Sequence, residues 1–158
     1  MEKILNRHRN SILAAAAAVL VTASPAMAQS WDVLAEEGYA VASVSNGDSS
    51  FGVECMETGY PTFMFAPANF VQARRPVDAV IRAGDQTFTW PARAMPDLGR
   101  YDIIPENATP LDVDWLMGLL ASENRVSVSI PSLNLSVTFS LAGSADALPP
   151  VVAVCEGR

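Results

Sequence analysis

The sequence predicts a mainly β or α+β fold: an antiparallel β-sheet or sandwich, one packed helix over about 109–122 and a short C-terminal helix. Three observations predict it. Apolar and polar residues alternate along 126–130 and again along 133–141, as in the two strands of an amphipathic hairpin with a Pro-Ser turn between them. A helical spacing of leucines precedes that hairpin. Two cysteines, Cys55 and Cys155, lie far apart in the chain and can tie its end to an early strand.

An N-terminal leader precedes the fold. Residues 1–28 combine a cationic start, an apolar run and the small-x-small sequence Ala26-Met27-Ala28, which is typical of a signal-peptidase site. We therefore expect a cleavable signal peptide, a mature N-terminus at Gln29 and one periplasmic domain over 29–158, in a Gram-negative bacterium. The apolar run is shorter than the ~20 residues of a spanning helix, so we expect no membrane insertion after cleavage; an uncleaved anchor is the alternative.

Cleavage would leave a strongly acidic domain. The only Lys (Lys3) and the only His (His8) lie in the leader, so residues 29–158 hold seven Arg against sixteen Asp and Glu, a net charge of −9. Nucleic acids and anionic membranes require clustered cations, so this charge argues against both as partners. A cationic protein partner is compatible with it. The simpler interpretation is that the charge maintains solubility.

The two cysteines predict one structural disulfide, because they form a minimal even set in an exported chain. Cys55 shares the inward face of a predicted strand with Phe51 and Val53, where a disulfide would be shielded. A reactive thiol would be expected near cations or in a Cys-x-x-Cys spacing, and neither occurs here. A bond from Cys55 to Cys155 would close a loop of about 100 residues and, in the chain-entropy description, stabilise the fold by about 4–5 kcal/mol.

The first half of the mature domain reads as strands joined by turns. It opens on a short acidic and apolar lead-in. Asn46-Gly47-Asp48 is typical of a tight turn, because Asn and Gly accept positive φ. Alternating residues predict strands over residues 39–45, 50–57 and 86–90. A mostly apolar strand is predicted over 62–66, and a strand whose facing is ambiguous over 77–82.

One helix is predicted after an irregular segment. Residues 91–110 are rich in Pro, Gly and Asp and hold one short extended piece at 101–104. Thr109 is then a suitable helix N-cap, since a Pro follows at the first helical position and two aspartates lie near the positive end of the helix dipole. The helix should pack an apolar stripe on the sheet, formed by Leu111, Trp115, Leu116, Leu119 and Leu120.

The end of the chain predicts a second, short helix. Leu148, Val151, Val152 and Cys155 recur at helical spacing, so Cys155 should share a buried face with them. Proline fits only the first turn of a helix, so we expect a turn over 144–148 and a helix from about Pro150. The disulfide would attach this helix to the strand that holds Cys55.

The mature domain lacks the side chains of common catalytic sites. Without His or Lys, its serines have no usual general base, and two thiols cannot build a metal cluster site. We therefore expect no enzyme activity, no metal and no cofactor. Two weaker alternatives stay open: carboxylate pairs that hydrolyse glycans, and oxygen ligands for calcium. The acids considered for calcium are Asp97, Asp102, Glu106, Asp112 and Asp114.

Two surface features are candidates for binding another protein. One is cationic: Arg74 and Arg75, together with Arg93 and Arg100, flank the region of Trp90. The simpler interpretation makes these arginines solvated loop residues and Trp90 a core residue. The second is the uncharged outward face of the hairpin, which suits strand addition or is an ordinary hydrated face. Its residues are Ser127, Ser129, Asn134, Ser136, Thr138 and Ser140, among which we single out Ser129, Ser136 and Thr138.

The order of these elements resembles a known family. A leader is followed by a strand with Phe51-Gly52-Val53-Glu54-Cys55, a strand ending in Trp90 and a helix of the Leu111–Leu120 kind. Then come Val137-Thr138-Phe139-Ser140-Leu141, Gly143, Ala147-Leu148 and the terminal Cys155. This layout resembles the small periplasmic proteins associated with type VI secretion, of the VasI/TagO kind, although Pro149-Pro150 departs from the unbroken terminal helix expected there. The resemblance implies a periplasmic accessory or binding role and carries over no catalytic residue.

Together, these observations predict a non-enzymatic periplasmic protein that binds another envelope protein, as an accessory of a secretion system. The alternative is an inhibitor of a cationic periplasmic hydrolase such as a lysozyme, which the acidic charge suggests. A carboxylate-dependent glycan hydrolase ranks last, because it needs two carboxylates roughly 5–10 Å apart in a concave cleft.

Overall fold

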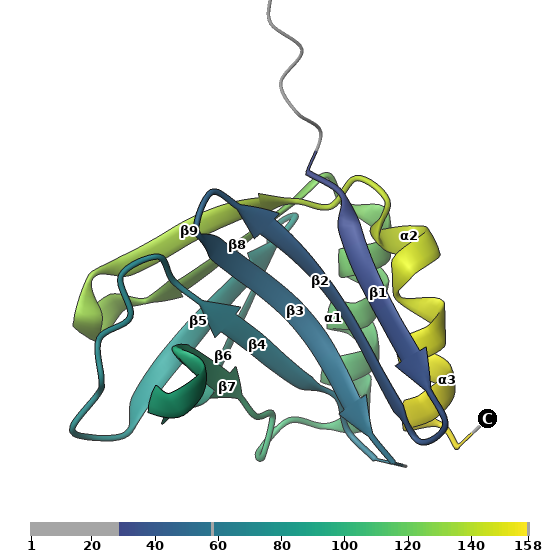
Figure 1. Ribbon diagram of the computed structural model, residues 1–158, viewed down its shortest axis with the longest axis horizontal. Helices are drawn as coiled ribbons and strands as arrows, with labels where there is room; N and C mark the ends of the chain where they lie inside the picture. Colours follow the sequence, from purple (N-terminus) through teal and green to yellow (C-terminus); the bar gives the residue numbers. More distant parts are fainter. Residues whose placement is uncertain (1–28, 58, 158) are drawn as a thin grey trace, which may run out of the picture.

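The computed structural model describes residues 29–57 and 59–157, so the predicted signal peptide at 1–28 lies outside the described residues. One strongly curled sheet carries helices along one side (Figure 1). In the described part of the chain, nine strands form this sheet. They are β1 (Trp31–Glu36), β2 (Tyr39–Asn46), β3 (Ser49–Met56), β4 (Thr62–Ala66), β5 (Val77–Ala83), β6 (Gln86–Met95), β7 (Arg100–Ile103), β8 (Arg125–Ile130) and β9 (Leu135–Ser140).

The sheet curls into a half-barrel. Its strand order is β1-β2-β3-β4-β7-β6-β5-β8-β9, and neighbouring strands are antiparallel. The last strand returns to the first half of the sheet: the ring of Phe139 in β9 lies 5.9 Å from that of Phe51 in β3 and 6.3 Å from that of Phe65 in β4. Asn46 at the end of β2 donates from Nδ2 to the carbonyl oxygen of Thr138 at 2.8 Å. The predicted antiparallel β architecture is confirmed, as one curled sheet around an aromatic core.

The β8–β9 hairpin follows the predicted alternation, with a longer turn. Val126, at the start of β8, is fully buried and pairs with the buried Phe139. A 3-10 turn at Pro131–Leu133 (η2) leads into Asn134, whose φ of 54° is left-handed. Asn tolerates this conformation better than most residues. The second strand therefore begins at Leu135 rather than at Leu133.

Helix α1 (Pro110–Ser122) has the bounds that the sequence predicts. Thr109 and Asp112 form a reciprocal capping box: the Asp112 backbone N–H donates to the Thr109 hydroxyl at 3.3 Å, and the Thr109 backbone N–H donates to the Asp112 carboxylate at 2.9 Å. The Thr109 hydroxyl also donates to the Asp112 carboxylate, at 2.8 Å. The bonds from the Thr109 backbone N–H and then from its hydroxyl stabilise the charged carboxylate, so they hold the pKa of Asp112 below its ordinary value.

The buried face of α1 differs from the prediction. Leu111 is 78% exposed and Trp115 is 52% exposed. Trp115 meets the core edge-on, at Phe88, with a ring-centroid distance of 6.2 Å. Aromatic side chains of the strands already fill the interior, so a narrower stripe of aliphatic residues faces it. The buried residues of α1 are Val113, Leu116 and Leu120.

The C-terminal helices are tied to the sheet as predicted. A disulfide joins Cys55 of β3 to Cys155, with 5.5 Å between the Cα atoms and a sequence separation of 100. Cys155 ends α3 (Pro149–Cys155), which packs against β2 and β3. The predicted turn over 144–148 is instead one turn of helix, α2 (Ser144–Ala147), and α3 starts one residue earlier than expected, since proline is accommodated at the first helical positions. Among the described residues, the helices are too short or too polar to span a bilayer.

Two strand predictions were incomplete. The lead-in at the start of the mature chain is β1, whose residues are exposed along most of its length, so it shows no one-sided burial pattern. β6 continues past Trp90 through Pro91 to Met95. Pro91 pairs with Asp78 of β5, but its carbonyl oxygen points toward β7 and accepts from the Ile104 N–H at 3.1 Å. Its missing N–H therefore also lies on the β7 side, where the regular ladder ends at the pair Ala92–Ile103, so no ladder hydrogen bond is lost. The predicted piece at 101–104 is β7, and a 3-10 turn at Pro96–Leu98 (η1) joins it to β6.

Candidate binding site

A cleft of about 590 Å³ lies between loop 67–76 and the second half of β6. Arg74 and Arg75 enter it from the loop, Arg93 enters from β6, and Glu106 is the carboxylate at its edge. Arg93 points to the outer surface because it alternates with Ala92, which is buried in the barrel. Three of the four arginines that the sequence groups together therefore meet at one cleft.

Loop 67–76 is attached to the barrel by hydrogen bonds of its backbone and by one aromatic side chain. The Ala68 backbone N–H donates to the Ser49 hydroxyl at 2.9 Å, and the hydroxyl of Tyr101 donates to the carbonyl oxygen of Val71. The rings of Phe70 and Tyr101 lie 5.1 Å apart. Burial raises the pKa of Tyr101, so its hydroxyl stays protonated and able to donate. These contacts hold the first half of the loop, which leads into Arg74 and Arg75.

A second hollow lies on the other side of the same loop. It has a volume of about 320 Å³ and is lined by Arg74, Arg75 and Val77 together with Ser132 and Leu133 of η2. The arginine-bearing loop thus forms a ridge between the cleft and the tip of the β8–β9 hairpin.

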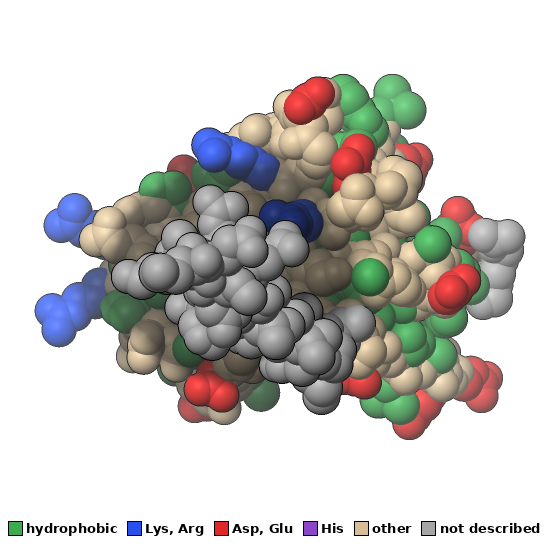
Figure 2. All heavy atoms as spheres, turned by 90° about the horizontal axis from the view of Figure 1, so that it is seen from above, with side chains coloured by type: hydrophobic (Ala, Val, Ile, Leu, Met, Phe, Trp, Pro, Cys, Tyr) green, Lys and Arg blue, Asp and Glu red, His purple; other side chains and the backbone are tan. Residues whose placement is uncertain are grey.

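Charge is distributed unevenly over the molecule. In Figure 2 the Lys and Arg side chains lie over the left half and the centre, toward the end where loop 67–76 and the hairpin tip lie in Figure 1. Most Asp and Glu side chains lie over the right half, where the helices are found. The cationic cleft and the acidic helix side therefore lie toward opposite ends of one acidic protein.

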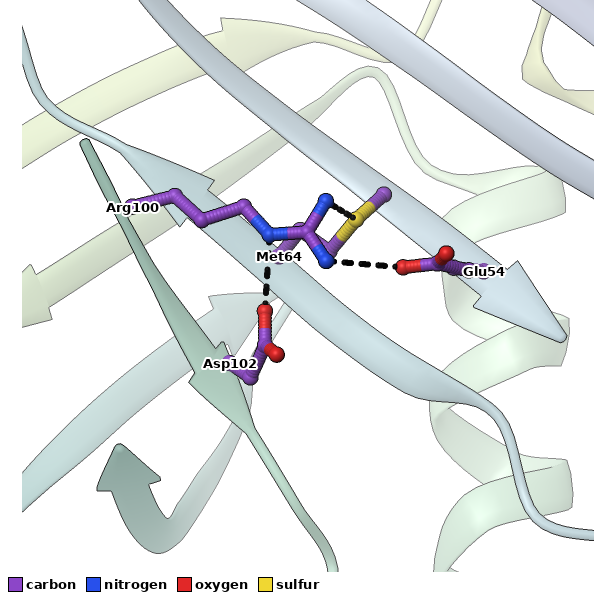
Figure 3. Close-up of polar contacts among 4 residues, drawn as sticks. All are labelled: Glu54, Met64, Arg100 and Asp102. Atoms are coloured by element: carbon purple, nitrogen blue, oxygen red, sulfur yellow. Dashed lines mark hydrogen bonds and ion pairs between the residues drawn. The ribbon is translucent and has the colours of Figure 1, made fainter. Parts of the chain in front are cut away.

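Arg100, the fourth arginine of the predicted group, has a different role. Its guanidinium lies on the outer face of the sheet, 3.0 Å from Glu54 Oε2 of β3 and 2.9 Å from Asp102 Oδ1 of β7, and it donates to Met64 Sδ of β4 (Figure 3). These charged side chains are only 11–24% exposed. Tyr39 of β2 adds a hydrogen bond to Glu54, and burial together with the Glu54 charge raises the pKa of Tyr39. This polar clasp of Tyr39, Glu54, Met64, Arg100 and Asp102 joins four neighbouring strands, and it leaves Arg100 little surface for a partner.

Trp90 is a core residue. It is 7% exposed, its ring stacks on Phe63 at 5.5 Å, and it contacts Phe88 at 5.4 Å. The sequence groups Trp90 with the arginines. In the structure, Trp90 and Arg93 both belong to β6, but Trp90 points into the barrel and Arg93 points outward. Any partner of the arginines meets the outer surface of β6, without the indole.

The uncharged outer face of the hairpin is partly engaged within the protein. The hydroxyls of Ser127 and Thr138 lie 2.7 Å apart, and the Ser129 hydroxyl reaches the carbonyl oxygen of Val80 at 3.5 Å. Ser136 and Thr138 are exposed. The free edge of β9 is also covered in part, because Asn46 caps the Thr138 carbonyl and the Gln29 side chain accepts from the Ser140 backbone N–H at 2.7 Å.

Two of the five carboxylates that the sequence raises for calcium binding have structural partners. Asp112 caps α1, and Asp102 is paired with Arg100. Glu54 and Asp102 share that one guanidinium on the outer face of the sheet, away from the interior of the barrel. Within the described residues, no group of three or more His, Cys, Asp or Glu side chains is placed to hold a metal ion.

No family model, no curated protein and no solved structure matches the chain. The resemblance to the small periplasmic proteins of type VI secretion therefore stays a prediction from the order of elements.

Proposed function

We propose that this protein is an exported, non-enzymatic periplasmic binding protein that contacts another envelope protein through its arginine cleft, as an accessory of an envelope secretion system. The convergence of Arg74, Arg75 and Arg93 on one cleft of about 590 Å³ supports this proposal most directly. These residues are half of the six arginines in the described part of the chain.

The chemistry of the cleft favours an acidic protein segment. The planar guanidinium binds carboxylates through two parallel hydrogen bonds, and the anchored loop 67–76 reduces the entropy lost on binding. The net charge of the mature chain repels anions over the rest of the surface. An acidic segment is therefore directed to the one end where arginines gather.

Capture from an envelope extract tests the cleft. We expect the wild-type mature protein to retain a partner that the Arg74→Ala/Arg75→Ala variant loses. The matched control is Arg82→Ala/Arg125→Ala, which removes the same charge from two exposed arginines that do not line the cleft. If both double variants lost the partner equally, the effect would be one of net charge. If both retained the partner, the cleft would be excluded as the binding site.

A second double variant tests whether the partner binds the hairpin face instead of the cleft. Ser136→Asp with Thr138→Asp places two charges on exposed positions of β9 without touching the cleft. The arginine-cleft proposal predicts unchanged capture, together with a loss of stability of about 1 kcal/mol from the missing hydrogen bond between Ser127 and Thr138. Loss of the partner in this variant alone would move the binding site to the strand face.

One observation favours a second candidate, an inhibitor of a cationic hydrolase such as a lysozyme. The acidic side chains gather over the helix side of the molecule (Figure 2), which gives a cationic enzyme a surface of opposite charge. Adding the purified mature protein to a lysozyme assay decides it. No inhibition at stoichiometric excess would remove this candidate.

A further inference from the structure

A groove of about 280 Å³ lies between α1 and α3, on the side opposite the arginine cleft. Val113 and Met117 of α1 form one wall, and Val152 of α3 forms the other. Tyr60, which is 60% exposed, and the buried Pro61 also line it. The walls and floor are thus apolar, although the groove opens on the surface.

The groove has a fixed shape because α3 cannot move away from the sheet. Cys155 lines the groove and is bonded to Cys55 of β3. The Gly59 backbone N–H also donates to the carbonyl oxygen of Cys155 at 3.0 Å. A preformed apolar groove binds a side chain without first ordering its own walls.

The rim of the groove is acidic. Asp114, which is exposed on α1, lines it. Asp114 lies within one turn of Met117 on the helix surface, so a ligand that fills the groove also meets its carboxylate. The charge of the rim selects a cationic occupant.

The outer face of α1 extends this surface. With 100° between successive residues, Asp114 lies between Met117 on one side and the exposed pair Leu111 and Trp115 on the other. Gly118 lies in the middle of this face, and a Cβ added there would meet no atom within 4 Å. Glycine inside a helix costs about 1 kcal/mol relative to alanine, and packing within the protein does not require it here. Gly118 leaves this face of the helix flat, so another chain can pack closely against it.

We propose that this groove binds a segment of a protein partner in which an apolar side chain lies next to Lys or Arg. The apolar side chain fills the groove between Met117 and Val152, and the cation meets Asp114 and the exposed ring of Trp115. The proposal goes beyond the arginine cleft and does not depend on it, because the two sites share no residue and select opposite charges.

The test uses the mature protein labelled with ¹⁵N and three synthetic peptides: Ac-LKLKLK-NH₂, Ac-LELELE-NH₂ and Ac-SKSKSK-NH₂. We expect the first peptide to shift the amide signals of Val113, Met117 and Val152, and to bind at least tenfold more tightly than either of the others. The acidic peptide tests the charge of the rim. The serine peptide tests the apolar groove.

Two charge reversals complete the test. Asp114→Lys should weaken binding of the leucine–lysine peptide at least tenfold. Asp146→Lys on α2, an exposed aspartate that does not line the groove, changes the net charge equally and should leave binding unchanged. Equal binding of the lysine and glutamate peptides, signal shifts confined to other parts of the protein, or equal effects of both reversals would overturn the proposal.

Discussion

The two ends of this half-barrel are made rigid in different ways. At the cleft end, loop 67–76 is held by one hydrogen bond to the Ser49 hydroxyl, one from the Tyr101 hydroxyl, and one aromatic contact. At the helix end, a covalent bond between Cys55 and Cys155 fixes α3 to β3. The same sheet therefore supports a cationic cleft made by a loop and an acidic groove made by helices. Tethers of about 1 kcal/mol hold the first site, and a cross-link of several kcal/mol holds the second.

The largest effect is expected from breaking the covalent tether. Cys55→Ala with Cys155→Ala should lower the free energy of unfolding by about 4–5 kcal/mol, because the unfolded chain regains a loop of about 100 residues. Urea unfolding measures the loss. Hydrogen exchange should rise most in α3, where local opening adds to the smaller rise that the lower global stability causes in β5 and β6. A uniform rise over both ends would contradict the idea that the two ends are fixed independently.

The polar clasp between the two ends comes next. Arg100→Met should destabilise the fold by roughly 1–3 kcal/mol, since it leaves Glu54 and Asp102 close together, poorly solvated and without their shared cation. Chemical denaturation gives the value. Adding Glu54→Gln and Asp102→Asn to the same variant should recover part of the loss. No recovery would show that the arginine acts mainly by packing against Met64.

Tyr101→Phe loosens the cleft end alone. We expect a loss of about 0.5–1.5 kcal/mol from the missing hydrogen bond to Val71, with faster exchange in loop 67–76 and unchanged exchange in α3.

The same tyrosine predicts a response to alkaline pH. Its pKa is raised in the folded state, so the stability that its protonated form contributes is complete below the ordinary value of 10.0 and is lost as pH rises beyond it. The Phe variant should therefore lose less stability than the wild type above pH 10. Parallel alkaline losses in the two proteins would assign the effect to other groups.

The smallest effect is expected from the cap of α1. Thr109→Ala removes the hydroxyl that accepts from Asp112 and should cost about 0.5–1 kcal/mol. The lowered pKa of Asp112 should move part of the way back toward 3.8, because the backbone hydrogen bond from residue 109 remains. NMR titration of the Asp112 carboxyl carbon measures this shift. The charged Asp112 carboxylate stabilises the fold fully above its ordinary pKa, and this stabilisation is lost as pH falls through its lowered pKa.

Local patterns were sufficient for most of the fold. The alternation along β8 and β9 shows which residues are buried, and the residues around Thr109 show where a helix begins. The pair Cys55–Cys155 follows from the presence of only two cysteines after the predicted leader. β1 could not be recognised in this way. It is an edge strand with most of its residues exposed, so its sequence carries no alternation.

One turn signal in the sequence went unused. Met95-Pro96-Asp97-Leu98-Gly99 and Ile130-Pro131-Ser132-Leu133-Asn134 share a Pro-x-Leu core followed by a residue that tolerates positive φ. Each forms a 3-10 turn between two antiparallel strands, with φ of 61° at Gly99 and 54° at Asn134. Comparing the two segments would have predicted that β6 extends past Pro91, as β8 extends up to Pro131.

The candidate site was predictable only in part. Arg74 and Arg75 are adjacent in the sequence, and Arg93 joins them because β5 and β6 are paired. That Arg100 belongs to the clasp depends on the placement of β7 between β4 and β6, which no local pattern encodes. The groove between α1 and α3 was missed for the same reason, since its two walls meet only through the disulfide and the packing of the helices.

Photocrosslinking inside cells tests the central claim most directly. A benzoylphenylalanine in place of Gln72, an exposed residue of the cleft, should give one discrete adduct with an envelope protein, and Arg74→Ala/Arg75→Ala should abolish it. The same probe in place of Thr87, an exposed position of β6 outside the cleft, should give none. An adduct that persists without the two arginines, or one that forms equally from Thr87, would contradict the account.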